Sequence, residues 1–319
     1  MPKVSIIVPI YGVEKYIERC ARSLFEQTLD DLELLFIDDC TPDKSMEVLK
    51  RVLEEYPQRK HQIVIHRMEH NSGQAVVREW GIKNATGEYI IHCDSDDWVD
   101  VRMYETLYNK AVSKNADVVV CDYIITDGKD SRTIVNACQS RDLQTFIENC
   151  LLQREPWSLC NKLFNRKAYS KIAYPTGAMG EDMTITLQLL WNCQRLSYAP
   201  EPFYFYYHNP NSITNKRTIN DCLRNYSTLK GNTDILLNSL SAKPLTKNMK
   251  GGLLLIRYNV LSMLYPIIWN PKYYIVWRTT YKNFIIKYLF AKNVQLSDKL
   301  RILLALAHLY PRKRDRIYE

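Results

Sequence analysis

The fold is decided by residues 88–98, which read Glu88-Tyr-Ile-Ile-His-Cys-Asp94-Ser-Asp96-Asp97-Trp98. The first half is a β-prone apolar run of the kind that a sheet buried on both faces requires. The second half carries three carboxylates within four residues, and burying even one ionised carboxylate without a partner is costly. In an extended chain the side chains at i and i+2 project the same way, so Asp94 and Asp96 are expected to converge on one point.

Two interpretations of this D-x-D sequence are open. Oxygen ligands at a strand end suit a hard divalent cation such as Mg²⁺ or Mn²⁺, which is itself usually bridged to a phosphate. An acidic turn that leaves a strand is the simpler interpretation, and for an isolated D-x-D it is the better one. The choice depends on what the rest of the chain places beside it.

Strand and helix patterns alternate through the first hundred residues. Apolar runs predict strands over residues 3–11, 32–37, 62–66 and 89–91, with helices over 13–25, after Asp43 and over 74–84. This alternation predicts a mostly parallel α/β sheet with helices on both faces. Ligands bind such sheets at the carboxyl ends of the strands. Those ends hold Tyr11, Asp38-Asp39, Asn71-Ser-Gly73 and the acidic stretch, which favours a site over a turn.

Phosphate-binding glycine loops are missing from the sequence. No G-x-G-x-x-G follows the first strand and no G-x-x-x-x-G-K-[ST] occurs, which disfavours dinucleotide-binding dehydrogenases and P-loop hydrolases. Any phosphate is therefore expected to be held by metal and basic side chains.

The charge of the chain is unevenly distributed. From residue 241 onward there are 15 Lys and Arg against 3 Asp and Glu, whereas the first 240 residues carry 28 against 32. Aromatic and apolar segments interleaved with basic residues suit an interfacial position on anionic lipid. A helical subdomain packed on the catalytic core, with a solvated basic tail that includes Pro311-Arg-Lys-Arg314, is the alternative interpretation. We expect an anionic membrane surface rather than nucleic acid as the partner of this extension.

The cysteines and the first residues bear on location. Nine cysteines occur without a C-x-x-C pair, as is typical of buried thiols in a reducing compartment. Residues 1–9 run directly into a strand without a signal-peptide layout, and no apolar run reaches the length of a spanning helix. We therefore expect a cytoplasmic protein that is able to associate peripherally with the inner face of the cell membrane.

An ordered set of motifs runs through roughly residues 3–215. The motifs are Val4-Ser-Ile-Ile-Val-Pro-Ile-Tyr11, Ser23-Leu-Phe-Glu-Gln-Thr28, Leu35-Phe-Ile-Asp-Asp39, Asn71-Ser-Gly73 with Arg78, Ala85-Thr-Gly-Glu-Tyr-Ile-Ile91, Asp94-Ser-Asp-Asp-Trp98, Trp157-Ser-Leu-Cys-Asn-Lys-Leu-Phe164, Gly180-Glu-Asp182, Tyr204-Phe-Tyr-Tyr207 and Asn211-Ser-Ile-Thr214. In order and spacing this set resembles the family 2 glycosyltransferases of the GT-A fold, in the branch that makes bacterial polysaccharides. The ordered set is specific, although each piece alone is weak.

The resemblance implies a role for each matching residue. Asp94 and Asp96 would hold the divalent metal, Mn²⁺ or Mg²⁺, with His208 as a weaker third candidate. Asp182 would be the catalytic base, although an unaligned Asp at this position is more often a helix cap. The nucleotide-sugar would be bound by Pro9, Tyr11, Asp39, Asn71, Gly73, Arg78, Asp94, Ser95 and Asp96.

Two departures concern the edges of this pocket. Gly12 stands where the family usually has Asn, and Tyr207-His208 stands where a Tyr-Arg pair is common. Lys162 is a candidate for contacting a donor phosphate, with a solvated lysine as the default interpretation. Trp157 is equally expected to stack on an acceptor sugar or to pack in the core.

The resemblance implies an inverting, metal-dependent transferase. It would move a sugar from a nucleoside-diphosphate sugar, with a family preference for UDP, to a saccharide or lipid-linked acceptor. The expected domains are residues 1–215, which bind the donor and catalyse transfer, and 216–319, a helical basic extension. A sugar-nucleotide nucleotidyltransferase and a non-catalytic nucleotide- or membrane-binding scaffold stay open as alternatives.

Overall fold

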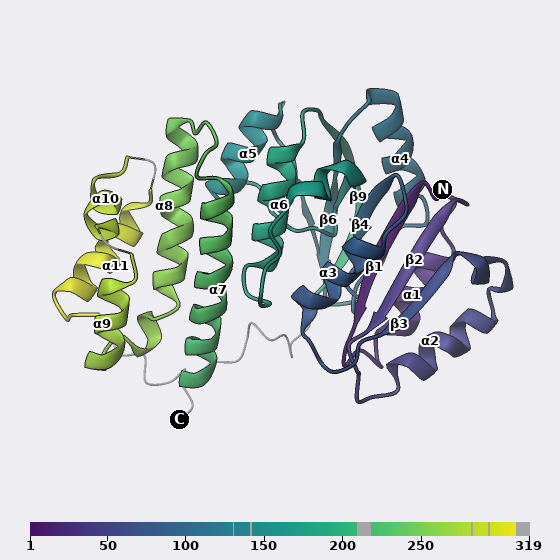
Figure 1. Ribbon diagram of the computed structural model, residues 1–319, viewed down its shortest axis with the longest axis horizontal. Helices are drawn as coiled ribbons and strands as arrows, with labels where there is room; N and C mark the ends of the chain where they lie inside the picture. The colour runs from purple at the N-terminus through teal and green to yellow at the C-terminus, as the bar shows by residue number, and fades with distance from the viewer. Residues whose placement is uncertain (130, 141, 209–217, 282, 293, 311–319) are drawn as a thin grey trace.

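The computed structural model describes residues 1–129, 131–140, 142–208, 218–281, 283–292 and 294–310. Within them a single sheet has the strand order β3-β2-β1-β4-β8-β6-β9-β5, and β7 pairs with β6 (Figure 1). The strands are β1 (Val4–Ile10), β2 (Leu32–Asp38), β3 (Ile63–Arg67), β4 (Tyr89–His92), β5 (Trp98–Val99), β6 (Val118–Thr126), β7 (Arg132–Val135), β8 (Lys162–Asn165) and β9 (Leu196–Tyr207).

Helices cover the sheet and then continue beyond it. The α-helices are α1 (Ile17–Phe25), α2 (Ser45–Glu54), α3 (Gln74–Asn84), α4 (Met103–Lys114), α5 (Leu143–Leu151), α6 (Glu181–Asn192), α7 (Ile219–Ser239), α8 (Lys247–Ser262), α9 (Pro271–Thr279), α10 (Phe284–Phe290) and α11 (Leu296–Leu306). Short 3₁₀ helices are η1 (Pro57–Gln62), η2 (Arg166–Lys171) and η4 (Tyr265–Ile267).

The parallel half of the sheet has the predicted strands. β1 pairs in parallel with both β2 and β4, and β2 pairs in parallel with β3. The other half is mixed, because β8 runs antiparallel to both β4 and β6. The expected fold class is confirmed, with its parallel character concentrated in the first hundred residues.

The first helix begins later than predicted. The chain turns at Gly12, where φ is +67°, and the following amides contact the loop after β2. Gly12 N donates to Thr41 Oγ1 at 2.9 Å, and Val13 N donates to Ser45 Oγ at 3.1 Å. Residues 14–16 then form a turn, and α1 starts at Ile17.

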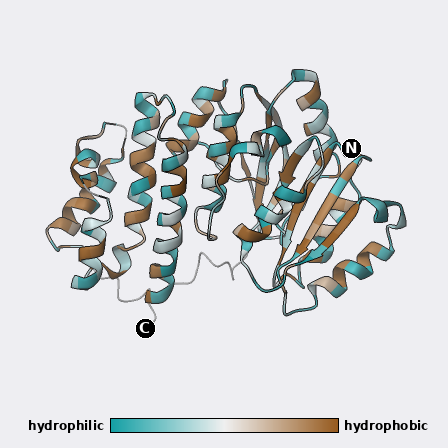
Figure 2. Ribbon diagram, in the orientation of Figure 1, coloured by the Kyte–Doolittle hydropathy of each residue, from teal (hydrophilic) through white to brown (hydrophobic). Residues whose placement is uncertain are grey.

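Alternating side chains of the strands enter two cores. Ile6 packs in a cluster with residues of α1, α2 and α4, whereas Ile7 packs with residues of α3, α5 and α6. Figure 2 shows the strands as apolar bands between these helices. A sheet covered on both faces has its polar groups displaced to its edges, which is where the site lies.

The helices after residue 218 extend the molecule away from the sheet (Figure 1). Leu236 of α7 and Ile256 of α8 belong to the same core cluster as the strands. α8 approaches α5 so closely that a Cβ at Gly252 would lie 2.5 Å from Leu151 Cβ. The core-packed interpretation therefore describes α7 and α8, and the division of the chain at residue 215 stays a prediction.

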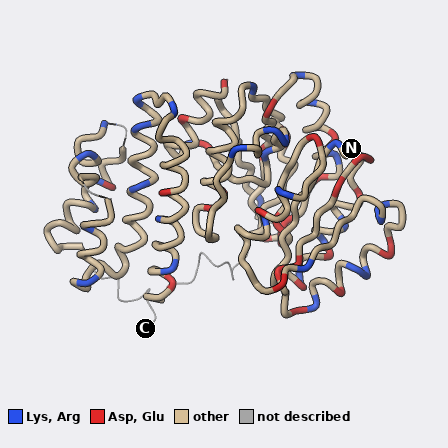
Figure 3. The backbone as a smooth tube through the Cα atoms, viewed as in Figure 1, with Lys and Arg blue, Asp and Glu red and all other residues tan. Residues whose placement is uncertain are grey.

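A further core joins the outer helices. Trp277, Tyr288 and Ile302 are buried in a cluster formed by α8–α11. Figure 3 shows that Lys and Arg outnumber acidic residues along these helices. No helix in the described ranges is long and apolar enough to cross a bilayer. The motif at Asn211–Thr214 and the basic run at Pro311–Arg314 lie outside the described residues.

Candidate active site

Five segments meet at the carboxyl edge of the parallel strands. The ends of β1 and β2 are in register, with Ile10 opposite Asp38, and β4 ends beside them at His92. Two helices point their amino-terminal turns at this edge: α3 begins at Gln74 and α6 begins at Glu181. The polar residues of the sequence motifs therefore come together where parallel sheets bind ligands.

Arg78 is the centre of this arrangement. Its Nη2 lies 2.5 Å from Asp94 Oδ1, and its Nη1 lies 2.8 Å from Glu181 Oε1 and 2.5 Å from Asp182 Oδ1. The side chain of Arg78 is only 1% exposed. One guanidinium thus contacts both the predicted metal ligand Asp94 and the predicted base Asp182. Arg78 and Asp182 are 104 residues apart in the sequence.

The charges in this cluster are out of balance. Burial lowers the pKa of Arg78, but the charges of Glu181, Asp94 and Asp182 raise it well above its usual value. Burial raises the pKa of Glu181 to about 7, against the opposing effect of Arg78 and with a further rise from Asp182. Burial also raises the pKa of Asp182, and Arg78 opposes that rise. Three carboxylates around one cation leave negative charge that a divalent cation would neutralise.

The acidic stretch itself is a turn and not an extended chain. β4 ends at His92, and Asp97 N donates to Asp94 O at 3.1 Å. The expected extended geometry at Asp94 and Asp96 is therefore corrected, because the backbone angles of the turn place the two side chains. Arg19 Nη2 donates to the backbone oxygen of Asp96 at 3.1 Å, which ties the turn to α1.

Asp97 has a structural role within the turn. Its Oδ2 accepts from Tyr204 Oη at 2.5 Å and its Oδ1 accepts from Tyr207 N at 2.7 Å. Burial raises the pKa of Asp97 well above its usual value, helped by the charges of Asp94 and Asp96. These bonds fix the acidic turn against β9, and within that turn Asp94 and Asp96 are both half-buried.

The donor set fits a hard cation that shares its shell with a phosphate. Asp94 and Asp96 offer carboxylate oxygens, the ligands that Mg²⁺ and Mn²⁺ prefer. No group of three His, Cys, Asp or Glu able to hold a metal occurs among the described residues. His208 is exposed at the end of β9 and does not complete such a group. Further ligands would have to come from a substrate, as is usual for Mg²⁺ sites.

Asp39 holds the loop that leads into α3. Its Oδ1 accepts from Ser72 N at 2.7 Å and its Oδ2 accepts from Gly73 N at 2.8 Å. Gly73 has φ of +82°, a conformation that side chains rarely adopt, so the glycine permits the turn that brings both amides to Asp39. The exposed Asn71 lies on the same loop. The predicted contact of Asp39 with a base or ribose stays a prediction.

The remaining predicted residues line the same edge. Ser95 is buried and its Oγ donates to Pro9 O at 2.6 Å, which fixes β1 to the acidic turn. Tyr11 is 51% exposed, so its ring is available for stacking. Trp157 is half-buried against the core of α5 and α6, and its role towards an acceptor stays a prediction.

Lys162 is neither solvated nor placed to contact a donor phosphate, as the sequence had suggested. It is fully buried, and its Nζ donates to Ser158 O at 2.8 Å and to Asn161 Oδ1 at 3.0 Å. Burial lowers the pKa of Lys162. The ammonium holds the 158–162 turn, which carries Cys160 to within 3.4 Å of Asp94 Oδ2.

Three contacts of the cluster were not expected from the sequence. Glu181 shares Nη1 of Arg78 with Asp182, and its only signal was its place in the Gly180-Glu-Asp182 motif. Gln74 Nε2 donates to Asp94 Oδ1 at 3.3 Å. The guanidinium of Arg19 lies 3.4 Å from the ring centroid of Trp98, a cation–π contact beside the turn that no motif indicated.

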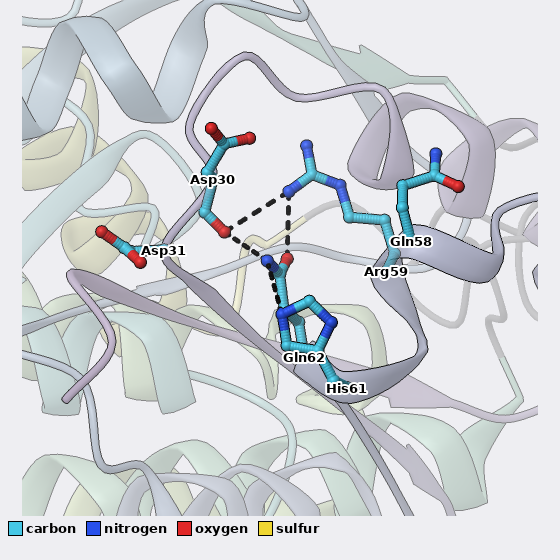
Figure 4. Close-up of a pocket in the computed structure, with 6 residues that line it drawn as sticks. All are labelled: Asp30, Asp31, Gln58, Arg59, His61 and Gln62. Atoms are coloured by element: carbon cyan, nitrogen blue, oxygen red, sulfur yellow. Dashed lines mark hydrogen bonds between the residues drawn. The ribbon is translucent and has the colours of Figure 1, made fainter.

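Neither of two cavities in the described part of the chain is lined by Arg78, Glu181 or Asp182. One of about 290 Å³ is lined by Asp30, Asp31, Gln58, Arg59, His61 and Gln62 (Figure 4). It lies before the first residues of β2 and β3, at the opposite edge of the sheet. The other, of about 620 Å³, lies between α1 and β5 beside Arg19 and Trp98. The convergent carboxylates, and not the cavities, mark the candidate site.

The chain is similar in sequence to known proteins. Residues 5–173 match the family described as Glycosyl transferase family 2. The uncharacterized glycosyltransferase EpsJ of Bacillus subtilis (strain 168) is 32% identical over 225 residues, which cover 67% of this chain and 63% of EpsJ. The chain therefore spans less than two thirds of that relative's length.

Two solved structures share the fold. S. aureus TarS 1-349 in complex with UDP-GlcNAc has a TM-score of 0.70 at 17% identity, over 97% of this chain and 88% of that chain. The mannosyltransferase PcManGT from Pyrobaculum calidifontis, in complex with GDP-Man and Mn²⁺, has a TM-score of 0.55 at 15% identity, over 98% of this chain and 88% of that chain. These likenesses are of fold, and they confirm the expected GT-A arrangement with its helical extension.

Proposed function

The chain belongs to glycosyltransferase family 2, and from that premise we propose that it is a metal-dependent, inverting glycosyltransferase. It would move a sugar from a nucleoside-diphosphate sugar to a saccharide or lipid-linked acceptor in surface polysaccharide synthesis. The observation that carries the proposal is the contact of one buried guanidinium with both Asp94 and Asp182.

We assign the donor to the edge between β1, β2 and β4. Asp94 and Asp96 would hold a divalent cation, Mn²⁺ or Mg²⁺, which supplies Lewis-acid neutralisation of the departing diphosphate. Pro9, Tyr11 and Asp39 would take the base and ribose, since they follow β1 and β2 along the same edge. The fold shared with a UDP-GlcNAc complex favours a UDP-linked donor.

Asp182 is proposed as the general base. It is one-third exposed, unlike Glu181 beside it, which is 2% exposed, so of these two carboxylates Asp182 is the one an acceptor hydroxyl can reach. A carboxylate within hydrogen-bond reach of the hydroxyl can take its proton during attack. Attack from the side opposite the diphosphate would invert the anomeric centre. Arg78 would orient Asp182 relative to Asp94 and so relative to the donor.

The proposed acceptor rests on a relative, and the proposed location rests on the sequence. A further relative, 26% identical, is named poly(ribitol-phosphate) beta-glucosyltransferase, of Bacillus spizizenii, which favours a surface glycopolymer or its lipid-linked precursor. We propose that the reaction takes place in the cytoplasm, at the inner face of the cell membrane.

The test is a panel of nucleotide sugars incubated with Mn²⁺ and candidate saccharide acceptors. Release of the free nucleoside diphosphate, with a product of inverted configuration by NMR, is expected. Release of pyrophosphate from a sugar phosphate and a nucleoside triphosphate would support a nucleotidyltransferase instead. Binding of a nucleotide sugar without turnover of any acceptor or of water would support a scaffold.

A further inference from the structure

The last two described helices pack against each other through a polar contact on their inner sides. Tyr288 of α10 is fully buried, and its Oη donates to Asp298 Oδ2 of α11 at 3.2 Å. Ile302 and Ala305 of α11 are buried on the same side. Lys299 Nζ donates to Ala291 O at 2.7 Å, which fixes the start of α11 against the end of α10.

The outer sides of both helices are apolar. Residues two positions from Tyr288 or Asp298 point roughly opposite to them, because two residues turn an α-helix by about 200°. All of these outer residues, and Leu303 one turn further along α11, are at least half exposed. We call this set the outer ridge: Ile286 (63%), Phe290 (83%), Leu296 (80%), Leu300 (55%) and Leu303 (50%).

A ridge of this kind is unusual on a water-facing surface. Single exposed apolar side chains are common, but several large ones side by side mark a contact surface. α11 is apolar on two sides, since it buries Ile302 inward and exposes Leu300 outward. Figure 1 places α10 and α11 at the end of the molecule farthest from β3, where no described element covers them.

The charge around the ridge is strongly positive. Residues 271–306 contain seven Lys and Arg and a single acidic residue, Asp298. Asp298 is buried beneath the ridge and pairs with Arg301 at 3.4 Å. The other exposed charges beside the ridge are basic, among them Lys287 and Lys292. Such a surface attracts anionic partners and repels another copy of itself.

We propose that the outer ridge docks on an anionic lipid bilayer, with α10 and α11 lying in the interface. Neither helix, at 7 and 11 residues, approaches the length of about 20 residues that a spanning helix needs. Apolar residues inserted among the head groups and basic residues beside them are the features of interfacial binding. A second copy is disfavoured, because two such faces would bring like charges together.

This inference deepens the proposed function, on which its biological meaning rests. An enzyme that extends a lipid-linked acceptor meets that acceptor only at a membrane surface. Docking on a membrane does not require catalytic activity, because the outer ridge is formed by α10 and α11 and shares no residue with the Arg78 cluster.

The experiment is co-sedimentation of the full chain with vesicles of phosphatidylcholine alone or mixed with phosphatidylglycerol. Wild-type protein is expected to partition at least about tenfold more strongly to the anionic vesicles, and less so at high salt. Phe290→Ser combined with Leu296→Ser is expected to reduce the partition coefficient by about tenfold or more, since two large apolar side chains leave the interface. Lys287→Glu should reduce it by a smaller factor.

Control variants replace apolar residues that are more than half exposed elsewhere on the molecule. Val112 on α4 and Ile134 on β7 are 53% and 60% exposed, so Val112→Ser and Ile134→Ser should bind vesicles as the wild type does. Circular dichroism melting verifies that each variant folds. Equal partition to neutral and anionic vesicles, or unchanged binding by the Phe290 and Leu296 variant, would overturn the proposal.

Two other readouts separate the remaining outcomes. Concentration-dependent dimers that the Phe290 and Leu296 variant loses, without vesicle binding, would assign the outer ridge to a second copy and overturn the proposal. Hydrolysis of the nucleotide sugar without vesicles tests the transferase alone. The double variant is expected to keep that activity, so failure of docking and failure of the proposed function are distinguishable.

Discussion

Two buried arginines at opposite edges of the sheet have opposite surroundings. Arg59 lies beside the cavity before β2 and donates only to neutral oxygens, among them Phe25 O at 3.0 Å, Leu29 O at 3.2 Å and Gln62 Oε1 at 3.0 Å. Arg78, at the other edge, contacts three carboxylates. Both side chains are nearly inaccessible, at 7% and 1% exposure.

The difference separates a structural site from a chemical one. Arg59 donates to the Phe25 carbonyl at the end of α1 and to the Leu29 carbonyl in the segment that follows it, and basic residues commonly satisfy carbonyls at a helix carboxyl terminus. Arg78 gathers more negative charge than it can neutralise, and ionisable groups gathered this way are typical of functional sites. The cavity of about 290 Å³ therefore lies beside Arg59, which has a structural role, whereas the proposed catalytic site lies around Arg78.

Replacing one carboxylate at each edge is expected to give the largest difference between the two edges. Asp182→Asn is expected to lower kcat by 10²–10⁴-fold, because a general base contributes about that much. Asp30→Asn, in the cavity beside Arg59, should leave kcat unchanged. Steady-state rates of nucleoside diphosphate release measure both. Full activity in Asp182→Asn with normal melting would remove the assignment of the base.

Removing each guanidinium gives the next largest effect. Arg78→Met is expected to lower the free energy of unfolding by about 3–5 kcal/mol at pH 8, since it leaves buried carboxylates unpaired. Part of that loss should be regained at pH 5, where those carboxylates can bind protons. Urea melts of the wild type and of Arg78→Met at pH 5 and pH 8 measure the loss of free energy of unfolding at each pH. A loss that does not depend on pH would mean that the carboxylates are not held by Arg78.

The excess of carboxylates around Arg78 should also make stability depend on pH through Glu181. Its pKa is raised from 4.5 to about 7, so between these values the folded state binds more protons than the unfolded state. The free energy of unfolding should therefore fall as the pH rises from 4.5 to 7. Glu181→Gln should remove this part of the slope, a difference on the order of 2–3 kcal/mol at pH 8. An unchanged slope by urea melts would contradict the raised pKa.

The smallest effect is expected at the structural edge. Arg59→Met should cost about 1–3 kcal/mol, because it leaves neutral carbonyls without a donor. That loss should be the same at pH 5 and pH 8, in contrast to Arg78→Met. Activity per folded molecule should match the wild type. A strong pH dependence of the Arg59→Met loss would mean that the two edges do not differ as described.

The sequence predicted the parallel strands and the positions of their polar ends, because both follow from local patterns. Asp94, Asp39 and Gly73 were placed at the carboxyl edge of the sheet in this way, since each lies just after a strand or just before a helix. The turn at Asp94–Asp97 was not predicted, because its shape depends on bonds from Tyr204 and Tyr207 of β9, far away in the chain.

The sequence also did not predict which charged residues are buried. Nothing local to Arg78 indicates that Glu181 and Asp182 will cover it, since they arrive with α6. Lys162 was expected at a phosphate or in water, and only the packing of β8 against α5 shows why it is buried. Long-range packing decides which charged residues are hidden, and local patterns do not report it.

The most direct test of the central claim is calorimetric titration of UDP, with and without Mn²⁺, into the wild type and Asp96→Asn. We predict that the wild type binds UDP only with Mn²⁺, that Asp96→Asn weakens this binding by about 100-fold or more, and that Asp30→Asn binds as the wild type does. UDP binding that is equally strong without Mn²⁺, or unchanged in Asp96→Asn, would contradict the placement of a metal-bound donor at this edge of the sheet.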